Sequence, residues 1–503
     1  MDGATTAQRQ GEAITSFASP PIGTTAQTLP FPRRRSLALS ESIVTGLVRL
    51  ADAVVFLAVA TALYLFYLGF DPGTVQTYAA VAIFQLGLNL VLMQNAALYE
   101  FNTIVAWPNR MRHLVTLFGL VALLLVAAAF ALRVSGQFSR VWFFSTVVCG
   151  AMATFAVRGV GRMMIGHLAR SGKLVRNMAI VGASGQAQHL VARLREHEVP
   201  WKRIIGIFDD RRTRVAREID GFPVLGNLDD LVGYVRRGRI QDVVITLPWS
   251  ADERLVNIIS RMRQLPVNIY LGSDLIGYHF PRHRELLLDG VPVMQIAPAP
   301  LTGWSGIVKW VEDKAVAVLA LALLSPLMLL IALAIKLDSP GPVFFRQKRY
   351  GFNNQLIEVW KFRSMYHHLR DDNAARLTEK NDPRVTRVGA FLRRTSLDEL
   401  PQLINVLKGQ MSVVGPRPHA LLAKAGGRLY EDVVAEYAVR HKVKPGISGW
   451  AQVKGWRGET DVPEKILNRV EHDLFYIENW SLWLDVKILL MTVWVAVTGR
   501  NAY

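Results

Sequence analysis

Five long apolar runs constrain this chain more than any other feature of its sequence. Four of them follow one another near the N-terminus, at Ala53–Phe70, Ala79–Tyr99, Leu114–Leu132 and Val141–Val157. Each approaches the roughly 20 residues that a helix needs to cross a bilayer. A helical bundle buried in a water-soluble core is the alternative, and four such runs in succession argue against it. Because 51% of the 503 residues are hydrophobic, the composition also indicates a membrane protein, with a four-helix transmembrane bundle over residues 46–160.

Positive charge around these runs predicts how they cross the membrane. The formal net charge is +18, and Lys and Arg follow the fourth run closely, whereas the loop Asp71–Thr77 has neither. Cytoplasmic loops carry the excess of Lys and Arg, so the N-terminus and everything after Arg158 are expected in the cytoplasm, although Arg133 and Arg140 fall on the other side. The first 45 residues, rich in Thr, Ala, Ser, Gln and Pro, are expected to form a disordered cytoplasmic tail. Basic residues beside anionic lipid account for the charge, and no nucleic-acid partner is expected.

A different pattern follows between residues 177 and 275. The string NMAIVGASGQAQHLVARL indicates a strand, a glycine turn and a helix, and RIIGIFDD, QDVVITL and LPVNIYL indicate further buried strands. This alternation predicts a Rossmann-like, doubly wound α/β domain. Its turn is a poor dinucleotide fingerprint, because Ser184 replaces a glycine and Ala187 stands at the third position. A structural or regulatory domain is therefore at least as good an interpretation as a nucleotide site, and residues 276–308 are expected to form a linker.

The fifth apolar run covers Ala315–Ile335 and leaves two topologies open. It is long enough to span a bilayer, but Lys314 and Lys336 flank it, and Ser325 and Pro326 stand at its midpoint. Proline removes one helical hydrogen bond, and Ser325 is suited to satisfy the backbone group that is freed. The basic ends favour a helix–break–helix that enters and leaves by one leaflet, with a kinked spanning helix as the alternative. The residues alone weigh the two almost evenly.

The last 170 residues carry the candidate chemistry. Basic strings gather around an acidic pair, Asp398 and Glu399, in LRRTSLDELPQL. Adjacent residues on a helix do not face each other, so one carboxylate is expected to attack a phosphorus atom while the other holds Mg²⁺ or handles a proton. The alternative is a helix N-terminus, with Ser396 as N-cap and both acids in the first turn. Arginine forks match phosphate oxygens, so a pyrophosphate substrate is expected, with Lys361 and Arg363 of KFRSM among its ligands.

These strings resemble the bacterial sugar transferase family, the monotopic phosphoglycosyl transferases. The likeness covers the last 190 residues and is carried by SPGPVFFRQKRYG, KFRSM, DPRVTRVG, LRRTSLDELPQLINVLKGQMSVVGPRP, KPGISGWAQV and FYIENWSLWLD. Members move a hexose 1-phosphate from a UDP-sugar onto undecaprenyl phosphate. The order of four spans, a Rossmann-like domain and this catalytic domain looks most like the glucose-1-phosphate transferases that start exopolysaccharide assembly.

The resemblance implies a role for each matching position. Asp398 matches the nucleophile that takes the phosphosugar and releases UMP, and Glu399 matches its acidic partner, tied to magnesium and proton handling. Arg393 matches a contact to the polyprenyl phosphate. The segment beside the nucleotide is matched by Pro416, Arg417 and Pro418.

Topology and location follow from the same resemblance. Ser325 and Pro326 match the break of a re-entrant membrane helix over residues 315–335, within a mainly α catalytic domain at residues 309–503. That match keeps the active site in the cytoplasm, at the bacterial inner membrane. The segment Trp480–Gly499 has too few apolar residues to span, and its tryptophans suit an interface, so it is expected to rest on the membrane.

Two other classes of function remain as alternatives. A membrane-tethered nucleotide-sugar epimerase or dehydratase would use the α/β domain, but the sequence has no Tyr-x-x-x-Lys pair. A non-enzymatic scaffold for polysaccharide export would use the acidic pair only as a helix cap. The residues leave the sugar undetermined, and the oligomeric state is open, with a homo-oligomer among the alternatives.

Overall fold

The start of the first helix shortens the predicted N-terminal tail. The structure is a computed structural model that describes residues 40–133, 136, 138–196, 201–211, 217–247, 251–272, 286–288, 291–369, 382–419, 424–425, 428–434, 436–456 and 463–498. Most of the predicted tail lies outside these ranges. Residues 41–45, however, belong to helix α1 (Glu41–Tyr67), and Glu41 places a carboxylate in its first turn, where the helix dipole favours one.

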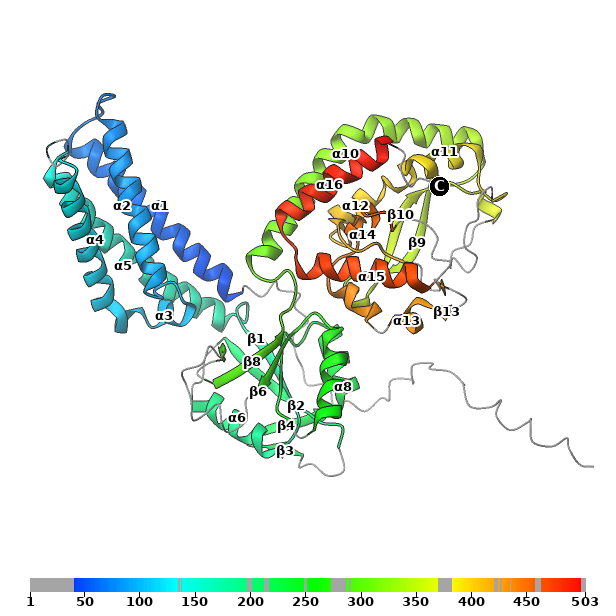
Figure 1. Cartoon of the computed structure of the whole chain (residues 1–503), viewed down its shortest axis with the longest axis horizontal. Coiled ribbons are helices and arrows are strands. Elements are labelled where there is room, and N and C mark those ends of the chain that lie inside the picture. Colours follow the sequence, from blue (N-terminus) through cyan, green and yellow to red (C-terminus); the bar gives the residue numbers. More distant parts are fainter. Residues whose placement is uncertain are drawn as a thin grey trace, which may run out of the picture. The chain divides into compact units, whose positions relative to one another are not determined.

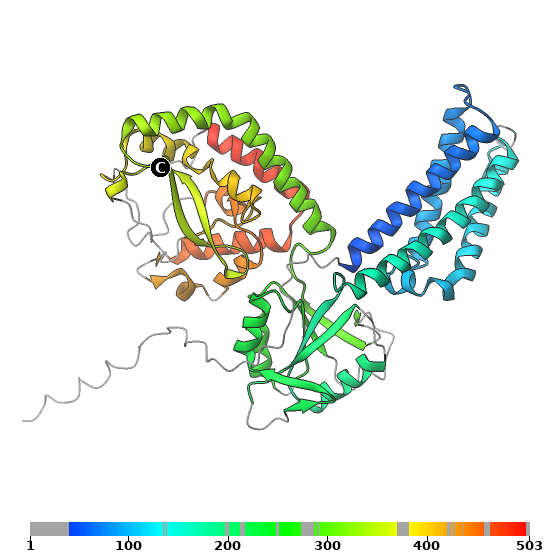
Figure 2. The same ribbon diagram turned by 180° about the vertical axis from the view of Figure 1, so that it is seen from behind.

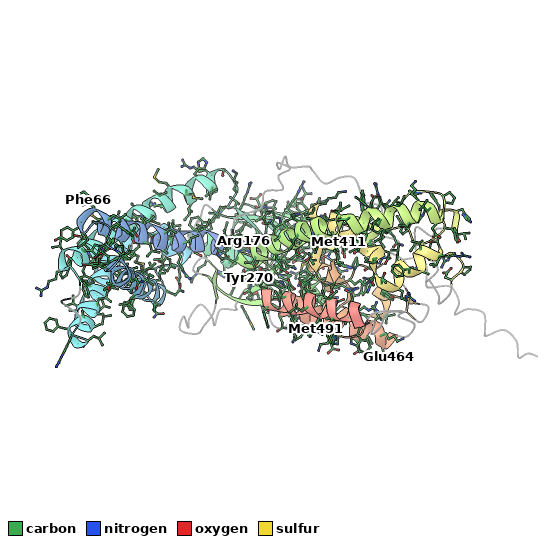
Figure 3. All side chains as sticks on the ribbon, turned by 90° about the horizontal axis from the view of Figure 1, so that it is seen from above. Phe66, Arg176, Tyr270, Met411, Glu464 and Met491 are labelled. Atoms are coloured by element: carbon green, nitrogen blue, oxygen red, sulfur yellow. The ribbon has the colours of Figure 1, made fainter. Side chains whose placement is uncertain are left out.

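Four long helices of the N-terminal part pack side by side (Figure 1). They are α1, α2 (Val75–Asn95), α4 (Met111–Ala131) and α5 (Arg140–Arg170), and the short α3 (Phe101–Val105) and η1 (Trp107–Arg110) lie between α2 and α4. Their outward faces are apolar, and Phe66, near the end of α1, is 92% exposed (Figure 3). These four helices are long and apolar enough to cross a membrane, as the sequence predicts. Their arrangement as a transmembrane bundle stays a prediction.

An eight-stranded sheet forms the core of the α/β domain. Its strand order is β3-β4-β2-β1-β5-β6-β8-β7, and the neighbours β4, β2, β1, β5 and β6 are parallel. Its elements are β1 (Arg176–Val181), α6 (Gly185–Glu196), β2 (Lys202–Phe208), β3 (Glu218–Ile219), β4 (Phe222–Gly226), α7 (Leu228–Arg236), β5 (Asp242–Ile245), α8 (Asp252–Arg263), β6 (Asn268–Gly272), β7 (Leu286–Leu288) and β8 (Val291–Ala297).

Alternating side chains of the parallel strands bury both faces of this sheet. Met178 and Ile180 of β1 pack in one core with α6, while Ala179 and Val181 pack in a second core with α7 and α8. Successive side chains of a strand point to opposite faces, so a strand covered on both sides is apolar throughout. The domain is therefore doubly wound, which confirms the predicted fold class for this part of the chain.

The predicted linker over residues 276–308 is wrong at its centre. β8 pairs antiparallel with β6, and β7 pairs antiparallel with β8, so both strands extend the sheet beyond its parallel part. An apolar hairpin satisfies the backbone groups that the edge of β6 would otherwise expose, and this explains why the chain does not leave the domain there. The next helix, α10, begins at Trp304, earlier than the predicted start of the catalytic domain at residue 309.

The catalytic domain is mainly helical, as predicted. Its elements are α10 (Trp304–Asp338), β9 (Phe344–Tyr350), η2 (Phe352–Asn354), β10 (Leu356–Phe362), η3 (His367–Leu369), α11 (Arg387–Thr395), η4 (Leu397–Glu399), α12 (Gln402–Leu407), β11 (Ser412–Val414), β12 (Lys424–Ala425), β13 (Arg428–Leu429), α13 (Tyr430–Val433), η5 (Tyr437–Lys442), β14 (Gly446–Ser448), α14 (Trp450–Val453), α15 (Pro463–Glu478) and α16 (Leu482–Thr498). Met411 is fully buried in its main core, to which α10, β10, α12 and α16 contribute (Figure 3). The antiparallel β9–β10 hairpin appears in both views beneath α10 (Figure 1, Figure 2).

Helix α10 runs through Pro326 without interruption, so the predicted break at Ser325 and Pro326 is wrong, and it arches over the catalytic domain (Figure 1, Figure 2). Pro326 has no N–H to donate to the carbonyl of Ala322, four residues earlier. The hydroxyl of Ser325 donates to that same carbonyl at 3.0 Å. The predicted part of Ser325 in satisfying the freed backbone group is therefore confirmed. The helix is also apolar and long enough to cross a membrane, so a re-entrant course stays a proposal.

Candidate active site

Three contacts fix the segment that carries the acidic pair. Asp338, the last residue of α10, accepts a hydrogen bond from the backbone N–H of Val388 in the first turn of α11, at 3.2 Å. Gly389 packs so tightly on the chain at Ser364 that a Cβ atom there would lie 2.0 Å from the Ser364 carbonyl oxygen. Leu392 of α11 is buried against the second half of α10. The end of α11 is thus fastened beside the apolar helix.

A left-handed residue turns the chain into the acidic pair. Ser396 has φ 58° and ends α11, and the 3-10 turn η4 then places Asp398 and Glu399. The side chain of Ser396 makes no capping hydrogen bond to this turn. Ser396 therefore stands at the N-terminal position that the alternative gives it, with both acids in the first turn, but the turn is a 3-10 turn and the serine side chain does not cap it. Both carboxylates are almost fully buried, which a pair of helix-capping surface acids would not be.

Glu399 is held as an ion by two cations. Lys361 of β10 donates to its Oε1 at 2.8 Å, and Arg417 donates to both carboxylate oxygens, with 3.0 Å from Nη1 to Oε2. Burial opposes ionisation of Glu399, but Arg417 and Lys361 outweigh it and hold the pKa of Glu399 well below its usual range. Arg417 thereby forms the forked pair that guanidinium and carboxylate geometry favours. Glu399 carries no proton at neutral pH.

Asp398 differs from Glu399 because its carboxylate oxygens are open, that is, they accept no hydrogen bond from the described residues. It is 9% exposed. Burial raises the pKa of Asp398 above its usual value, and the nearby Lys361 only partly offsets this effect. An ionised carboxylate with unused lone pairs and a raised pKa is a better nucleophile than one that is saturated by hydrogen bonds.

The structure brings most of the predicted site residues together. Arg393 faces the same acidic pair closely enough to lower the pKa of Asp398, and its guanidinium makes no hydrogen bond within the described part of the chain. Arg417 grips Glu399, as described above. The two flanking prolines shape the turn, since the carbonyl of Pro416 accepts from Gly446 and that of Pro418 accepts from Arg349.

Arg363 has a structural role that the sequence does not predict. Its guanidinium donates to the carbonyls of Ile335, Ser339 and Pro340, at 2.6 to 3.0 Å, and is buried against the end of α10. The last carbonyls of a helix have no partner within the helix, and Arg363 supplies one. We therefore leave Arg363 out of the proposed substrate site, although the string KFRSM also supplies Lys361.

Several ionisable residues near the site, most of them buried, were not singled out from the sequence. They are Arg349, His419, Arg440, Arg469 and Asp473. Burial, followed by Arg417, lowers the pKa of Arg349 to about 10. Burial and the surrounding arginines lower the pKa of His419 far below its usual range, so its ring is neutral. These residues come from segments that are far apart in the sequence, and only the fold gathers them.

Among the described residues around the acidic pair, cations outnumber carboxylates. Lys361 and four arginines (Arg349, Arg417, Arg440 and Arg469) stand against Asp398, Glu399 and Asp473. An excess of cations is typical of a site for an anion. A phosphate or diphosphate group would supply the missing negative charge, and arginine forks match its oxygens.

Magnesium fits this site only together with a phosphate ligand. No group of three or more His, Cys, Asp or Glu side chains able to hold a metal ion occurs in the described ranges. Both oxygens of Glu399 already accept hydrogen bonds from cations, whereas the oxygens of Asp398 are open. Mg²⁺ is commonly held by one or two carboxylates plus substrate phosphates. The donor set therefore suits an ion that Asp398 shares with a bound diphosphate.

A second acidic pair, Asp209 and Asp210 in the α/β domain, has carboxylate oxygens that already accept hydrogen bonds. Asp209 follows β2 and accepts hydrogen bonds from the backbone N–H of Ala183 in the glycine turn, from Arg211 and from Arg254, the shortest at 2.8 Å. Its neighbour Asp210 accepts from the N–H of Leu228 at the start of α7. The carboxylate of Asp209 thus accepts from an amide of the glycine turn, the kind of group that binds phosphate in dinucleotide folds.

Two family models match the chain. Residues 304–499 match the model described as bacterial sugar transferase, and residues 96–272 match the one described as CoA-binding domain. The first covers α10 and the whole acidic site. The second covers part of the N-terminal helices and most of the α/β domain.

Three named relatives resemble the chain, two of them over most of its length. The UDP-glucose:undecaprenyl-phosphate glucose-1-phosphate transferase of Escherichia coli (strain K12) is 41% identical over 70% of this chain and 76% of its own. The protein of the same name from Xanthomonas campestris pv. campestris is 36% identical over 85% and 90%. The UDP-N-acetylgalactosamine-undecaprenyl-phosphate N-acetylgalactosaminephosphotransferase of Aeromonas hydrophila is 43% identical over 45% and 53%.

Proposed function

The chain belongs to the bacterial sugar transferase family, and from this premise we propose that it transfers glucose 1-phosphate from UDP-glucose to undecaprenyl phosphate and releases UMP. Two long relatives carry that activity in their names. The observation that carries the proposal in this chain is the open carboxylate of Asp398 within a buried excess of cations. It fits a nucleophile that meets a diphosphate. The Aeromonas relative names another sugar, so the assignment to glucose depends on the long relatives.

The reaction is proposed to run in two displacements at phosphorus. An oxygen of Asp398 attacks the phosphorus that bears the sugar, the bond to the bridging oxygen breaks, and UMP leaves with that oxygen. The product on the protein is an acyl-phosphate that carries the hexose. A phosphate oxygen of the lipid then attacks the same phosphorus and releases the carboxylate, forming undecaprenyl diphosphate glucose. Neither displacement requires a net proton transfer.

The surrounding residues are proposed to orient and neutralise rather than to react. Arg417 and Lys361 keep Glu399 ionised and are themselves placed beside the diphosphate. Arg393, with a guanidinium that makes no hydrogen bond within the described residues, is placed to bind the incoming lipid phosphate. Magnesium, held by Asp398 and the substrate phosphates, would neutralise charge on the diphosphate. Because Glu399 holds no proton at neutral pH, we favour an orienting role over proton handling.

The proposed setting is the cytoplasmic face of the bacterial inner membrane. A re-entrant α10 would keep Lys314 and Lys336 on the cytoplasmic side. Exposed apolar residues of α16, among them Trp483 and Trp494, would rest on the same leaflet while Ile488 packs inward. A cysteine introduced at residue 340, after replacement of Cys149, should not react with an impermeant external reagent in intact cells. Labelling of that cysteine from outside would instead support a spanning α10.

A burst experiment tests the covalent mechanism. With UDP-glucose and Mg²⁺ but no lipid, the protein should release close to one UMP per active site and gain the mass of a hexose phosphate. Undecaprenyl phosphate should then discharge the trapped group. If no UMP forms until the lipid is present, and initial-rate plots intersect, a ternary complex replaces the aspartyl intermediate.

The two alternatives need other observations. Tightly bound NAD in the purified protein would favour an epimerase or dehydratase. Against this, Asp209 already accepts from the amide of Ala183 in the glycine turn. An export scaffold would be favoured by failure to release UMP from any UDP-sugar. A panel of UDP-sugars with undecaprenyl phosphate separates these alternatives and also identifies the hexose.

A further inference from the structure

The turn that carries Arg417 is held by its backbone as well as by its side chain. The carbonyl of Pro416 accepts from the N–H of Gly446 at 2.9 Å, and the carbonyl of Arg417 accepts from Nη2 of Arg440 at 2.7 Å. The carbonyl of Pro418 accepts from Arg349. Three consecutive carbonyls are thus bound, two of them by buried guanidinium groups. These contacts fix the position of the turn relative to the acidic pair.

Arg440 is the centre of this arrangement. It is 2% exposed, and Nη2 lies 2.6 Å from Oδ2 of Asp473 on α15. Its other amino group contacts Nδ1 of His419 and the hydroxyl of Tyr437. Burial would lower the pKa of Arg440, but Asp473 and Tyr437 together outweigh burial and raise it. The neutral ring of His419 accepts from the guanidinium and adds no further positive charge.

We propose that Arg440 and Asp473 form a positioning pair that fixes Arg417, and through it Glu399 and the nucleophile Asp398. The connection has four steps: Asp473 binds Arg440, Arg440 binds the carbonyl of Arg417, the guanidinium of Arg417 binds Glu399, and Glu399 adjoins Asp398. Neither Arg440 nor Asp473 touches the reacting atoms. The proposal rests on the proposed transfer reaction and adds residues that α15 and η5 contribute to it.

The geometry explains why such a pair matters for rate. The carbonyl that Arg440 binds and the guanidinium that grips Glu399 belong to the same residue, so a displaced backbone also displaces the fork. A misplacement of about 1 Å in a catalytic arrangement costs on the order of 100-fold in rate. Removal of Arg440 would also strand Asp473 without its closest cation in the interior, and a structural effect must therefore be separated from a positioning effect.

A double-mutant cycle makes that separation. Arg440→Lys should lower kcat for UMP release by about 10- to 100-fold, with a smaller change in KM for UDP-glucose. In an Arg417→Lys background, where the fork on Glu399 is already lost, the same change should cost less than about threefold, because groups that act as a unit are not additive. Equal factors in both backgrounds would overturn the positioning pair. Asp473→Asn should repeat the pattern.

Arg363→Lys is the matched control. Arg363 is also a buried arginine on backbone carbonyls, but it binds the end of α10 rather than the turn at Arg417. Its effect on kcat should be the same factor with Arg417 or Lys at position 417. Non-additivity equal to that of Arg440→Lys would show that any buried arginine produces the pattern, and would overturn the proposal.

Two further arms keep the test decisive. If Arg440→Lys does not fold, Tyr437→Phe removes only a hydroxyl that contacts Arg440 and His419, and should lower kcat about threefold in the natural chain and hardly at all beside Arg417→Lys. An additive result there overturns the pair. If the unaltered protein releases no UMP from any UDP-sugar, the proposed function itself fails. If the protein is active but the rate losses of the two substitutions multiply, only the positioning pair is overturned.

Discussion

The fold treats two of the chain's acidic pairs, Asp209–Asp210 and Asp398–Glu399, in opposite ways. In the α/β domain, Asp209 accepts hydrogen bonds from Ala183, Arg211 and Arg254, and these contacts hold its pKa below the usual value even though burial opposes them. In the catalytic domain, Asp398 accepts none within the described residues, and burial raises its pKa. The strings FDDRR and RRTSLDE look alike, so what separates a structural carboxylate from a reactive one is whether its lone pairs are used.

Replacement of the open carboxylate should have the largest effect. Asp398→Asn keeps the shape but removes the attacking oxygen, so UMP release should fall by about a thousandfold or more while the protein stays folded. Asp209→Asn is the matched control, since it makes the same change in the Asp209–Asp210 pair. Circular dichroism and a UMP-release assay measure both. Full turnover by folded Asp398→Asn protein would remove the distinction between the two acids.

Glu399→Gln should have the next largest effect. The amide loses the ionic pairing with Arg417 and Lys361, and the loss of one partner from a buried charge pair costs about 3–5 kcal/mol. We expect transfer to fall by about 100-fold or more, since both cations lose their anchor beside Asp398. Initial rates with UDP-glucose and lipid measure this. A variant with unaltered rates would mean that Arg417 and Lys361 are placed without Glu399.

Lowering the pH should stop transfer at Asp398 before it weakens the hydrogen bonds of Asp209. Transfer needs ionised Asp398, so the rate should fall about tenfold per pH unit once the pH drops below its raised pKa. Asp209 has a folded-state pKa below its ordinary value of 3.8, so its contribution to stability is present above that value and is lost only as the pH falls below it. Rates and thermal unfolding recorded over the same pH series test the order. Coincident losses would contradict it.

Asp209→Asn should have the smallest effect on function and a clear effect on stability. Hydrogen bonds to charged groups contribute about 1.5–3 kcal/mol each, and the amide keeps part of them. The α/β domain should therefore lose about 2 kcal/mol of unfolding free energy. Hydrogen exchange of the β1 amides measures the loss, and transfer per folded molecule should stay unchanged. A drop in transfer as large as that of Asp398→Asn would place Asp209 in the chemistry.

Local sequence predicted the elements whose signal is local. The apolar runs gave the long helices, Ser325 next to Pro326 gave the satisfied carbonyl of Ala322, and the alternating buried strings gave the parallel strands. The acidic pair was found because two carboxylates stand together. The hairpin β7–β8 was missed, because its pairing with β6 depends on an open sheet edge rather than on its own residues.

The charged residues around the acidic pair could not be predicted from the local sequence. Arg440, Arg469 and Asp473 lie 41 to 75 residues from the acidic pair, and nothing in their neighbours marks them as buried. The role of Arg363 was misjudged because Lys361, two residues before it, does face Glu399. Arg363 lies just after the end of β10, and its guanidinium reaches the end of α10 instead.

Contacts at the end of α10 fix the distance between this helix and the acidic turn. Arg363 holds the last turn of the apolar helix, and Lys361, two residues earlier in the chain, holds Glu399. Asp338 ties the same helix end to α11, which leads into the acidic turn. If α10 enters one leaflet as proposed, the depth at which it lies in lipid sets the height of Asp398 relative to the headgroups. A lipid-borne phosphate diffusing in the plane of that leaflet would then reach the carboxylate by lateral diffusion alone.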